Sequence, residues 1–161
     1  ELNRECLEQI EYCRKKNEQN KLIYQINIEN AKKGDEKAQY VIGYMYHKGK
    51  GVPKNYVKAA DWYKKAAEHK NIKALNNLAY LYQKGRGVEQ NLKKAEELLL
   101  ESAKQGDDVA CLNLGILYQT GKLGTANMED AEYWYRKAMD KGNPTATRIY
   151  RRIQSMEQKE N

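Results

Sequence analysis

Apolar residues recur along this chain with a helical period, and the whole pattern repeats every 36 residues. The period is marked by four alanines, Ala38, Ala74, Ala110 and Ala146. After each of the first three alanines, apolar residues follow at spacings of three or four, which predicts an amphipathic helix. These stripes are Ala38, Ile42, Met45 and Tyr46; Ala74, Leu78, Leu81 and Tyr82; and Ala110, Leu114, Leu117 and Tyr118. A period of this length predicts a stacked solenoid, in which each unit buries its apolar face against its neighbours.

A second helix is predicted in each unit, after a loop rich in glycine. In the first copy its apolar positions include Ala59, Trp62 and Tyr63. An asparagine precedes each second helix at the same spacing, and asparagine is a favoured N-cap. These asparagines are Asn55, Asn91 and Asn127. Each unit is therefore expected to be a helical hairpin.

A small residue recurs in the middle of each first helix, namely Gly43, Ala79 and Gly115. Glycine inside a helix costs about 1 kcal/mol relative to alanine. A small residue that recurs at one slot despite this cost predicts a close helix crossing, where a larger side chain does not fit.

The loops and turns between the helices also repeat, with two exceptions. The third loop displaces its second glycine to Gly124 and lacks the valine, so we expect a deformed loop there. Gly106 and Gly142 close two second helices, and Gly34 holds the same slot. Lys70 replaces glycine at the equivalent turn, so we expect a differently shaped join.

The stretches from Ala38 to Val52 and from Lys58 to Ala67 resemble the motif of the Sel-1-like repeat family, relatives of the tetratricopeptide repeats. The second copy departs from this motif at Leu98 and Leu99, where Trp-Tyr is expected. The resemblance implies an all-α fold, a right-handed α/α superhelix (solenoid) of helical-hairpin repeats.

We expect one solenoid domain over residues 1–161. Residues 1–36 look like a degenerate N-terminal capping unit without the glycine loop, and 144–161 look like a C-terminal capping helix that begins at Pro144. Between them lie repeats 37–72, 73–108 and 109–143.

The chain has a net charge of +7, and the charge is unevenly placed. Residues 37–72 hold eight Lys or Arg against two Asp or Glu, a net of +6 (8 − 2). Such a block could attract an acidic protein segment, nucleic acid or an anionic surface, although a solvated lysine-rich face is the commoner case.

The sequence offers no constellation for catalysis. The two histidines, His47 and His69, lie beside no plausible nucleophile, and there is no Cys-x-x-Cys motif for zinc. We therefore expect no enzyme activity, no cofactor and no bound metal. Some cysteine-rich members of the resembling family are associated with β-lactam binding or hydrolysis, which is one alternative. RNA binding through the basic first repeat is another, but no base-reading position recurs in each unit.

The cysteines Cys6, Cys13 and Cys111 show no disulfide spacing, and we expect them to fill small gaps in the core. Their usage fits a reducing compartment, so a cytoplasmic protein is expected. Because the chain starts without methionine, a processed periplasmic or secreted product is the alternative. No apolar run approaches the ~20 residues that span a bilayer.

The face of each first helix opposite the buried stripe is the predicted binding surface. In the resembling family first helices line the concave side, which implies that these residues form the floor of a groove. We expect the groove to bind a partner protein or peptide, including one with an acidic segment. The predicted partner-binding residues are Lys37, Tyr40, Tyr44, Lys73, Asn76, Tyr80, Leu112, Ile116 and Arg148. The alternative is that the tyrosines and aliphatic residues among them pack between adjacent first helices.

The predicted function is a protein–protein interaction scaffold or adaptor. We expect a bacterial protein with a host-interacting, regulatory or immunity-type role, which acts as a monomer.

Overall fold

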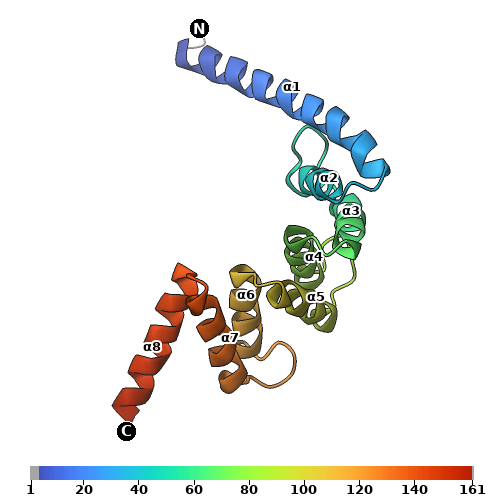
Figure 1. Ribbon diagram of the computed structural model, residues 1–161. Coiled ribbons are helices and arrows are strands. Elements are labelled where there is room, and N and C mark those ends of the chain that lie inside the picture. Colours follow the sequence, from blue (N-terminus) through green and yellow to red (C-terminus); the bar gives the residue numbers. More distant parts are fainter. Residues whose placement is uncertain (1–3, 161) are drawn as a thin grey trace. The chain divides into compact units, whose positions relative to one another are not determined.

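The computed structural model describes residues 4–160 of the chain, with side chains described to residue 156. Within this range the fold is all-α, with eight helices and no strand, which confirms the predicted fold class (Figure 1). The helices are α1 (Arg4–Lys32), α2 (Glu36–Lys48), α3 (Tyr56–Glu68), α4 (Ile72–Lys84), α5 (Leu92–Lys104), α6 (Asp108–Gln119), α7 (Met128–Asp140) and α8 (Pro144–Glu160). The first helices of the three repeats are thus α2, α4 and α6, and the second helices are α3, α5 and α7.

Residue contacts divide the chain into two compact units. Unit 1 comprises residues 1–71 and 86–88, and unit 2 comprises residues 72–85 and 89–161. In unit 1, α2 packs against both α1 and α3. In unit 2, each of the helices α4 to α8 packs against the next one along the chain. Both units therefore hold helices in sequential contact, as stacked hairpins require.

The two helices of each hairpin cross closely where the sequence predicted it. A Cβ placed on Gly43 would lie 2.7 Å from Cδ1 of Tyr63, and one on Gly115 would lie 2.5 Å from Cε1 of Tyr135. Both tyrosines are fully buried. In the second repeat Ala79 holds the small slot and Leu99 the large one, and both belong to one buried cluster. The sizes of the two facing residues are therefore complementary: glycine faces tyrosine, and alanine faces the smaller leucine.

In the first two repeats, the second glycine of the loop lies against the backbone of the helix that precedes the repeat. A Cβ on Gly51 would lie 2.6 Å from the carbonyl carbon of Asn20, and one on Gly87 would overlap the backbone of Tyr56. Gly124 in the third loop has nothing within 4 Å. The predicted deformation of the third loop is confirmed, because its displaced glycine makes no such contact.

The second helices begin with the predicted asparagine caps. The Lys58 N–H donates to Oδ1 of Asn55 at 2.9 Å, and Asn91 accepts from Lys94 N–H at 2.8 Å. Asn127 accepts from the Asp130 N–H at 3.0 Å.

The turn at Lys70 is a correction to the sequence prediction. Lys70 has φ of +60° and closes α3 with the bonds that glycine makes elsewhere, since its N–H donates to Ala67 O at 2.8 Å. Gly106 donates in the same way to Ala103 O at 2.9 Å. The join keeps the common shape, although a left-handed conformation costs a residue with a side chain roughly 1–2 kcal/mol.

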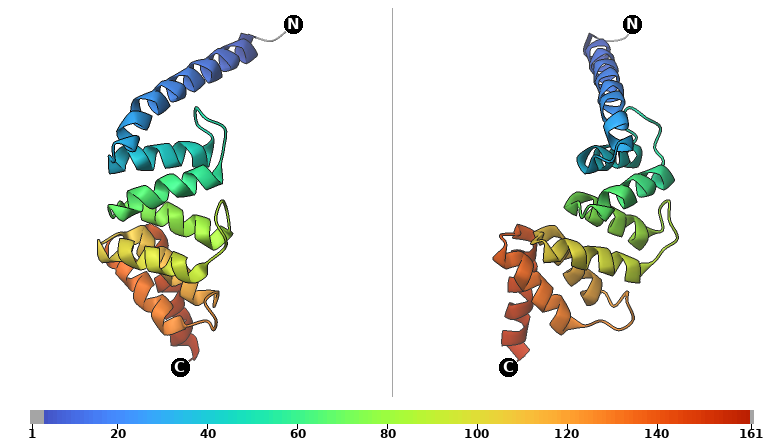
Figure 2. Two further views of the ribbon diagram at one scale, coloured as in Figure 1. Left: turned by 90° about the vertical axis from the view of Figure 1, so that its right-hand side faces the viewer. Right: turned by 45° about the vertical axis from the view of Figure 1, so that its right-hand side comes forward.

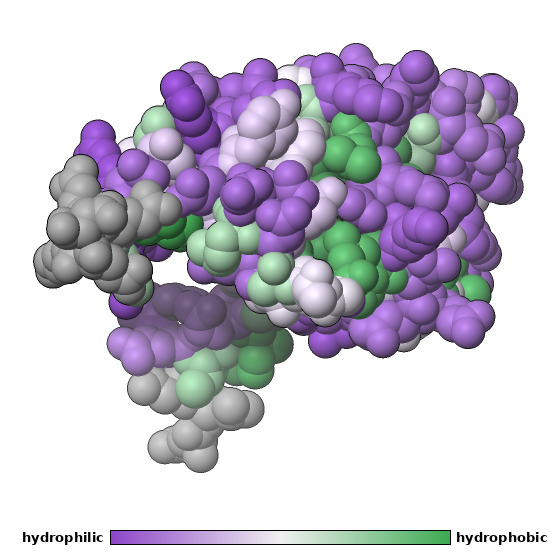
Figure 3. All heavy atoms as spheres, turned by 90° about the horizontal axis from the view of Figure 1, so that it is seen from below, coloured by the Kyte–Doolittle hydropathy of each residue, from purple (hydrophilic) through white to green (hydrophobic). Residues whose placement is uncertain are grey.

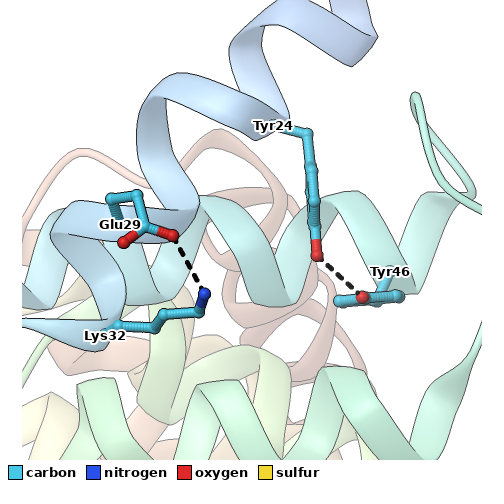
Figure 4. Close-up of polar contacts among 4 residues, drawn as sticks. All are labelled: Tyr24, Glu29, Lys32 and Tyr46. Carbon is cyan, nitrogen blue, oxygen red and sulfur yellow. Dashed lines mark hydrogen bonds and ion pairs between the residues drawn. The ribbon is translucent and has the colours of Figure 1, made fainter.

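The N-terminal segment is one continuous helix rather than a degenerate hairpin. Residues 20–32 of α1 take the place of a second helix, with Tyr24, Ile28 and Ala31 packed on α2. The hydroxyls of Tyr24 and Tyr46 point toward one another and are 3.0 Å apart (Figure 4). Residues 4–19 are all exposed and extend away from α2 (Figure 2). The apolar positions Leu7 and Ile10 follow a helical spacing but have no partner helix within unit 1, which the sequence pattern alone did not reveal.

The cysteines divide between surface and core. Cys6 and Cys13 are exposed on α1, so the prediction that they fill core gaps is wrong for both. Cys111 is fully buried in a cluster with Ala138 and Ala146. Burial raises the pKa of the Cys111 thiol, as is expected for a small residue that serves as a core hydrophobe.

The helix α8 begins at Pro144, as predicted, and ends the repeat pattern. Arg151 occupies the slot that Gly43, Ala79 and Gly115 hold in the other first helices, and it is exposed. Because an arginine leaves no room for a close crossing, α8 is suited to close the stack rather than to pair with a further second helix.

The size match at the hairpin crossing is testable in unit 1. We predict that Gly43→Ala lowers the free energy of unfolding by about 1–3 kcal/mol, because the added methyl overlaps the Tyr63 ring. Adding Tyr63→Leu copies the Ala79 and Leu99 pair of the second repeat and should recover part of that loss in urea unfolding. A double variant less stable than Gly43→Ala alone would contradict the size-match account.

Candidate partner-binding surfaces

The nine predicted partner-binding residues lie on the four helices expected to carry them, but in two separate units. Unit 1 holds Lys37, Tyr40 and Tyr44 on α2. Unit 2 holds Lys73, Asn76 and Tyr80 on α4, Leu112 and Ile116 on α6, and Arg148 on α8. Lys37, Lys73, Ile116 and Arg148 are exposed, and the other five are half-buried.

Two of these residues, at equivalent positions of the second and third repeats, contribute to packing. Leu112 packs against the buried cluster of Cys111, Ala138 and Ala146, which joins α6 to α7 and α8. Asn76 donates its amide N–H to Oδ2 of Asp107 at 2.8 Å, which links α4 to the start of α6. Both residues lie at the same position of their repeats. This position therefore joins successive first helices, as the packing alternative proposed.

Tyr40, the equivalent residue in unit 1, also has a packing role. Its ring stacks on the ring of the fully buried Tyr63, with centroids 6.0 Å apart. Tyr44 lies one turn further along α2, 6.2 Å from Tyr40, and is half-buried. The ammonium groups of Lys50 and Lys48 lie 5.1 and 5.9 Å from the centroid of the Tyr44 ring. The face of α2 is thus a tyrosine surface bordered by lysine.

In unit 2 the exposed part of the predicted surface is apolar and cationic. Val109 and Ile116 on α6 are 44 % and 40 % exposed. Arg148 and Arg152 on α8 are exposed as well. On the face drawn in Figure 3 most of the surface is hydrophilic, and hydrophobic residues form small separate patches. A partner of unit 2 would thus meet a few apolar contacts beside arginines.

A polar ladder at the starts of the first helices escaped the sequence analysis. Its members recur with the period of 36, and they are Asp35, Asn71, Asp107 and Asn143. Asp35, Asp107 and Asn143 each accept a hydrogen bond from the backbone N–H three residues on, at 2.6 to 2.9 Å. The sequence could have predicted this ladder, because aspartate and asparagine are favoured N-caps and recur here every 36 residues.

The two asparagines of the ladder also reach the preceding first helix. Asn143 donates to Oδ2 of Asp108 at 2.7 Å, and Asn71 donates to Oε2 of Glu36 at 3.4 Å. Asp107 has a carboxylate and cannot donate, and there Asn76 supplies the N–H instead. Asn76 thus takes the place of the ladder asparagine as the donor that links two first helices.

A buried histidine lies at the loop end of the hairpin in unit 1. His47 is 7 % exposed, and its Nδ1 lies 3.2 Å from the hydroxyl of Tyr63. Its ring meets the ring of Tyr56 edge-on at 5.5 Å. Burial lowers the pKa of His47 below its usual 6.5, and the nearby charges of Lys48, Arg86 and Lys54 lower it further. Gln119 replaces this histidine in the third repeat, where it accepts a hydrogen bond from Tyr135 at 2.6 Å.

Another tyrosine joins successive hairpins in unit 2. Tyr118 on α6 donates its hydroxyl to Oε1 of Glu96 on α5. Burial, followed by this bond, raises the pKa of Tyr118 to about 12. The hydroxyl therefore stays protonated and able to donate at physiological pH.

The described residues contain no group of three or more histidine, cysteine or acidic side chains placed to hold a metal ion. No helix within them is long and apolar enough to cross a membrane. The described cysteines are free thiols rather than disulfides.

The hydrogen bond between Asn76 and Asp107 gives a direct prediction. Asn76→Ala should lower the free energy of unfolding by about 1 kcal/mol, because Asp107 loses a hydrogen-bond donor at a part-buried site. Ile116→Ala, at an exposed position, should stay within roughly 0.5 kcal/mol of the unsubstituted protein in the same urea titration. Equal stabilities for the two variants would show that the bond between Asn76 and Asp107 does not join the helices.

Comparison with known proteins agrees with this architecture. The model of the Sel1 repeat family matches residues 36–71, 72–107 and 108–143. The crystal structure of a Sel1 repeat protein from Oxalobacter formigenes is similar with a TM-score of 0.67 and 37 % identity, over 73 % of this chain and 47 % of that one. A protective antigen present in uropathogenic Escherichia coli strains, displaying an SLR fold, has a TM-score of 0.74 and 31 % identity, over 79 % of this chain and 27 % of that one.

A curated relative is the chitin synthase regulator SKT5 of Saccharomyces cerevisiae, 40 % identical over 55 residues. The match covers 34 % of this chain and 8 % of the yeast protein, so the chain spans a small part of that relative. Sel1 repeat proteins are in general scaffolds for protein interaction, and the fold is typical of non-enzymatic proteins. With three matched repeats and two similar crystal structures, this chain belongs to the Sel1 repeat family.

Proposed function

We propose that this chain is an adaptor that holds a partner protein or peptide against the exposed faces of its first helices. The observation that carries the proposal is the exposure of Lys37, Ile116 and Arg148 at positions opposite the buried stripes. The buried stripes and the polar ladder stabilise the stack, and these positions contribute to neither. Residues that face solvent at repeating positions on a rigid helical scaffold are suited to recognition.

The chemistry of the two faces defines the partner. On unit 1 the face of α2 offers tyrosine rings bordered by lysine. On unit 2, the apolar side chains of Val109 and Ile116 lie on α6 and the arginines of α8 are exposed. Tyrosine and arginine are enriched among residues that dominate binding energies. A helical or extended segment with apolar anchors and carboxylates would satisfy either face.

A regulatory role is the form of this function that the yeast relative favours, since its name is that of a regulator. A host-interacting role is the form suggested by the similar structure of a protective antigen. Both forms use the same binding surfaces, and both remain proposals for this chain.

The test compares two double variants in unit 2 against a partner first isolated with the tagged unsubstituted chain and then purified. Ile116→Ser with Arg148→Ser removes one apolar and one basic side chain from first helices. Tyr133→Ser with Lys93→Ser removes the same two kinds of side chain from exposed positions of the second helices α7 and α5.

The first-helix variant should weaken the affinity at least about tenfold, as expected when binding residues are truncated. Its thermal unfolding should match that of the unsubstituted chain, and the second-helix variant should bind normally, as measured by isothermal titration calorimetry. Equal losses in both variants, or a loss confined to the second-helix variant, would place the binding surface elsewhere.

A further inference from the structure

Positive charge gathers where α2 ends and α3 begins in unit 1. Between Tyr44 and Lys58 the chain has four lysines, one histidine and no carboxylate. We call these lysines and a nearby arginine the cationic loop end: Lys48, Lys50, Lys54, Lys58 and Arg86. All five are exposed. Within the described residues none of the four lysines is in an ion pair.

Tyrosine rings lie beneath most of these cations. Besides the two lysines above Tyr44, the Lys58 ammonium lies 5.3 Å from the centroid of Tyr46 and the Arg86 guanidinium lies 5.5 Å from that of Tyr56. Such contacts are attractive because the face of an aromatic ring carries negative charge density. The rings hold the cations in place without neutralising their charge, so the surface keeps a strong positive field.

The complete set of four lysines occurs only in the first repeat. In the second repeat the equivalent residues are Lys84, Arg86, Gln90 and Lys94, and Lys94 forms an ion pair with Glu97. The equivalents of Lys48, Lys50, Lys54 and Lys58 in the third repeat are Thr120, Lys122, Ala126 and Asp130. One of these four is cationic and one is acidic. The repeat scaffold therefore does not require all four lysines, which leaves them available to a ligand.

We propose that the cationic loop end binds an acidic segment of a partner protein. The proposal rests on the adaptor function above and extends the lysine border of the α2 face, Lys48 and Lys50, to the residues of the loop. Four unpaired lysines and an arginine complement a run of Glu or Asp side chains, whose attraction speeds encounter and selects partners.

The same observations favour a peptide over a nucleic acid. Proteins that bind single strands stack bases on exposed aromatic faces. Here cations already lie against the faces of Tyr44, Tyr46 and Tyr56. What remains for a ligand is the lysine ammonium groups, which carboxylates match directly.

Binding at this surface is coupled to the protonation of His47. The groups around its ring are Lys48 on α2, Lys54 in the loop, Tyr56 and Tyr63 on α3, and Arg86 in the next loop. These cations disfavour the imidazolium, so an acidic ligand that offsets their field raises the pKa of His47. Coupling is reciprocal, so the ligand binds more tightly as the pH falls through that pKa.

The experiment uses the full chain and a synthetic peptide of alternating Glu and Gly, with a peptide of Gln and Gly as the neutral control. Affinity is measured at low salt by fluorescence anisotropy. The imidazole signals are followed by NMR from pH 8 to 5.5, with the His47 signal assigned by its loss in His47→Gln. The variants are Lys50→Glu at the loop end and Lys37→Glu on the first-helix face, so that each reverses the charge of one exposed lysine.

We expect the acidic peptide to bind, the loop-end variant to lose about tenfold or more in affinity, and Lys37→Glu to lose much less. With peptide bound, the pKa of His47 should rise, and affinity should increase as the pH falls from 8 to 5.5. His47→Gln should bind at pH 8 and lack that increase. Gln119 at the equivalent position shows that glutamine fits the site.

Other outcomes overturn the inference. Failure of the acidic peptide to bind, or a His47 signal that ignores it, removes the loop-end site and leaves the first-helix proposal standing. A loss confined to Lys37→Glu assigns the acidic segment to the first-helix face. Tighter binding of a single-stranded oligonucleotide of equal charge would identify the surface as one for nucleic acid.

Discussion

The distance between the two helices of each hairpin is the constraint on which the rest of this protein depends. It is set by one small residue, glycine or alanine, at the middle of the first helix. At Gly43 and Gly115 the missing side chain lets a tyrosine ring lie against the backbone of the first helix. Where the facing residue shrinks to Leu99, the small residue grows to Ala79. Interiors packed at this density tolerate little change of volume, so the two positions vary together.

This close approach determines which residues are available for binding. Because α1 and α3 pack on α2, its stripe from Ala38 to Met45 is buried, whereas Lys37 outside that stripe is exposed. Within unit 2 the polar ladder then joins successive first helices at their N-termini, as at Asn143 and Asp108. With stability supplied by these internal contacts, the outward residues and the loops are free to differ between repeats. The lysines of the first loop and the apolar residues of α6 are such differences.

The sequence predicted the parts of the fold that depend on local chemistry. A recurring Asn55 reports a helix cap because the cap is a bond within three residues. A recurring small residue reports a crossing because it serves no other purpose in a helix. The turn at Lys70 was mispredicted, since the lysine there adopts the left-handed conformation that glycine prefers and makes the same backbone bond.

Features that depend on distant partners were harder to predict. The course of α1 before residue 20 depends on whether another helix covers Leu7 and Ile10, which the periodicity of the sequence cannot show. Asn76 was assigned to the partner because it lies on the outer stripe, but its amide is bound to Asp107, 31 residues away. The pKa of His47 is lowered by burial and then by Lys48, Arg86 and Lys54, which only the folded structure brings together.

The most direct test of the crossing constraint exchanges its two extremes within one chain. Gly115→Arg introduces at the third crossing the residue that α8 carries at the same slot, and Arg151→Gly does the reverse. Hydrogen exchange measured by mass spectrometry should show that Gly115→Arg loses the slow-exchanging amides of both α6 and α7, because the arginine displaces Tyr135. Arg151→Gly should leave exchange in α6 and α7 unchanged. Retention of slow exchange in α6 and α7 of Gly115→Arg would contradict the claim that the small residue sets the hairpin.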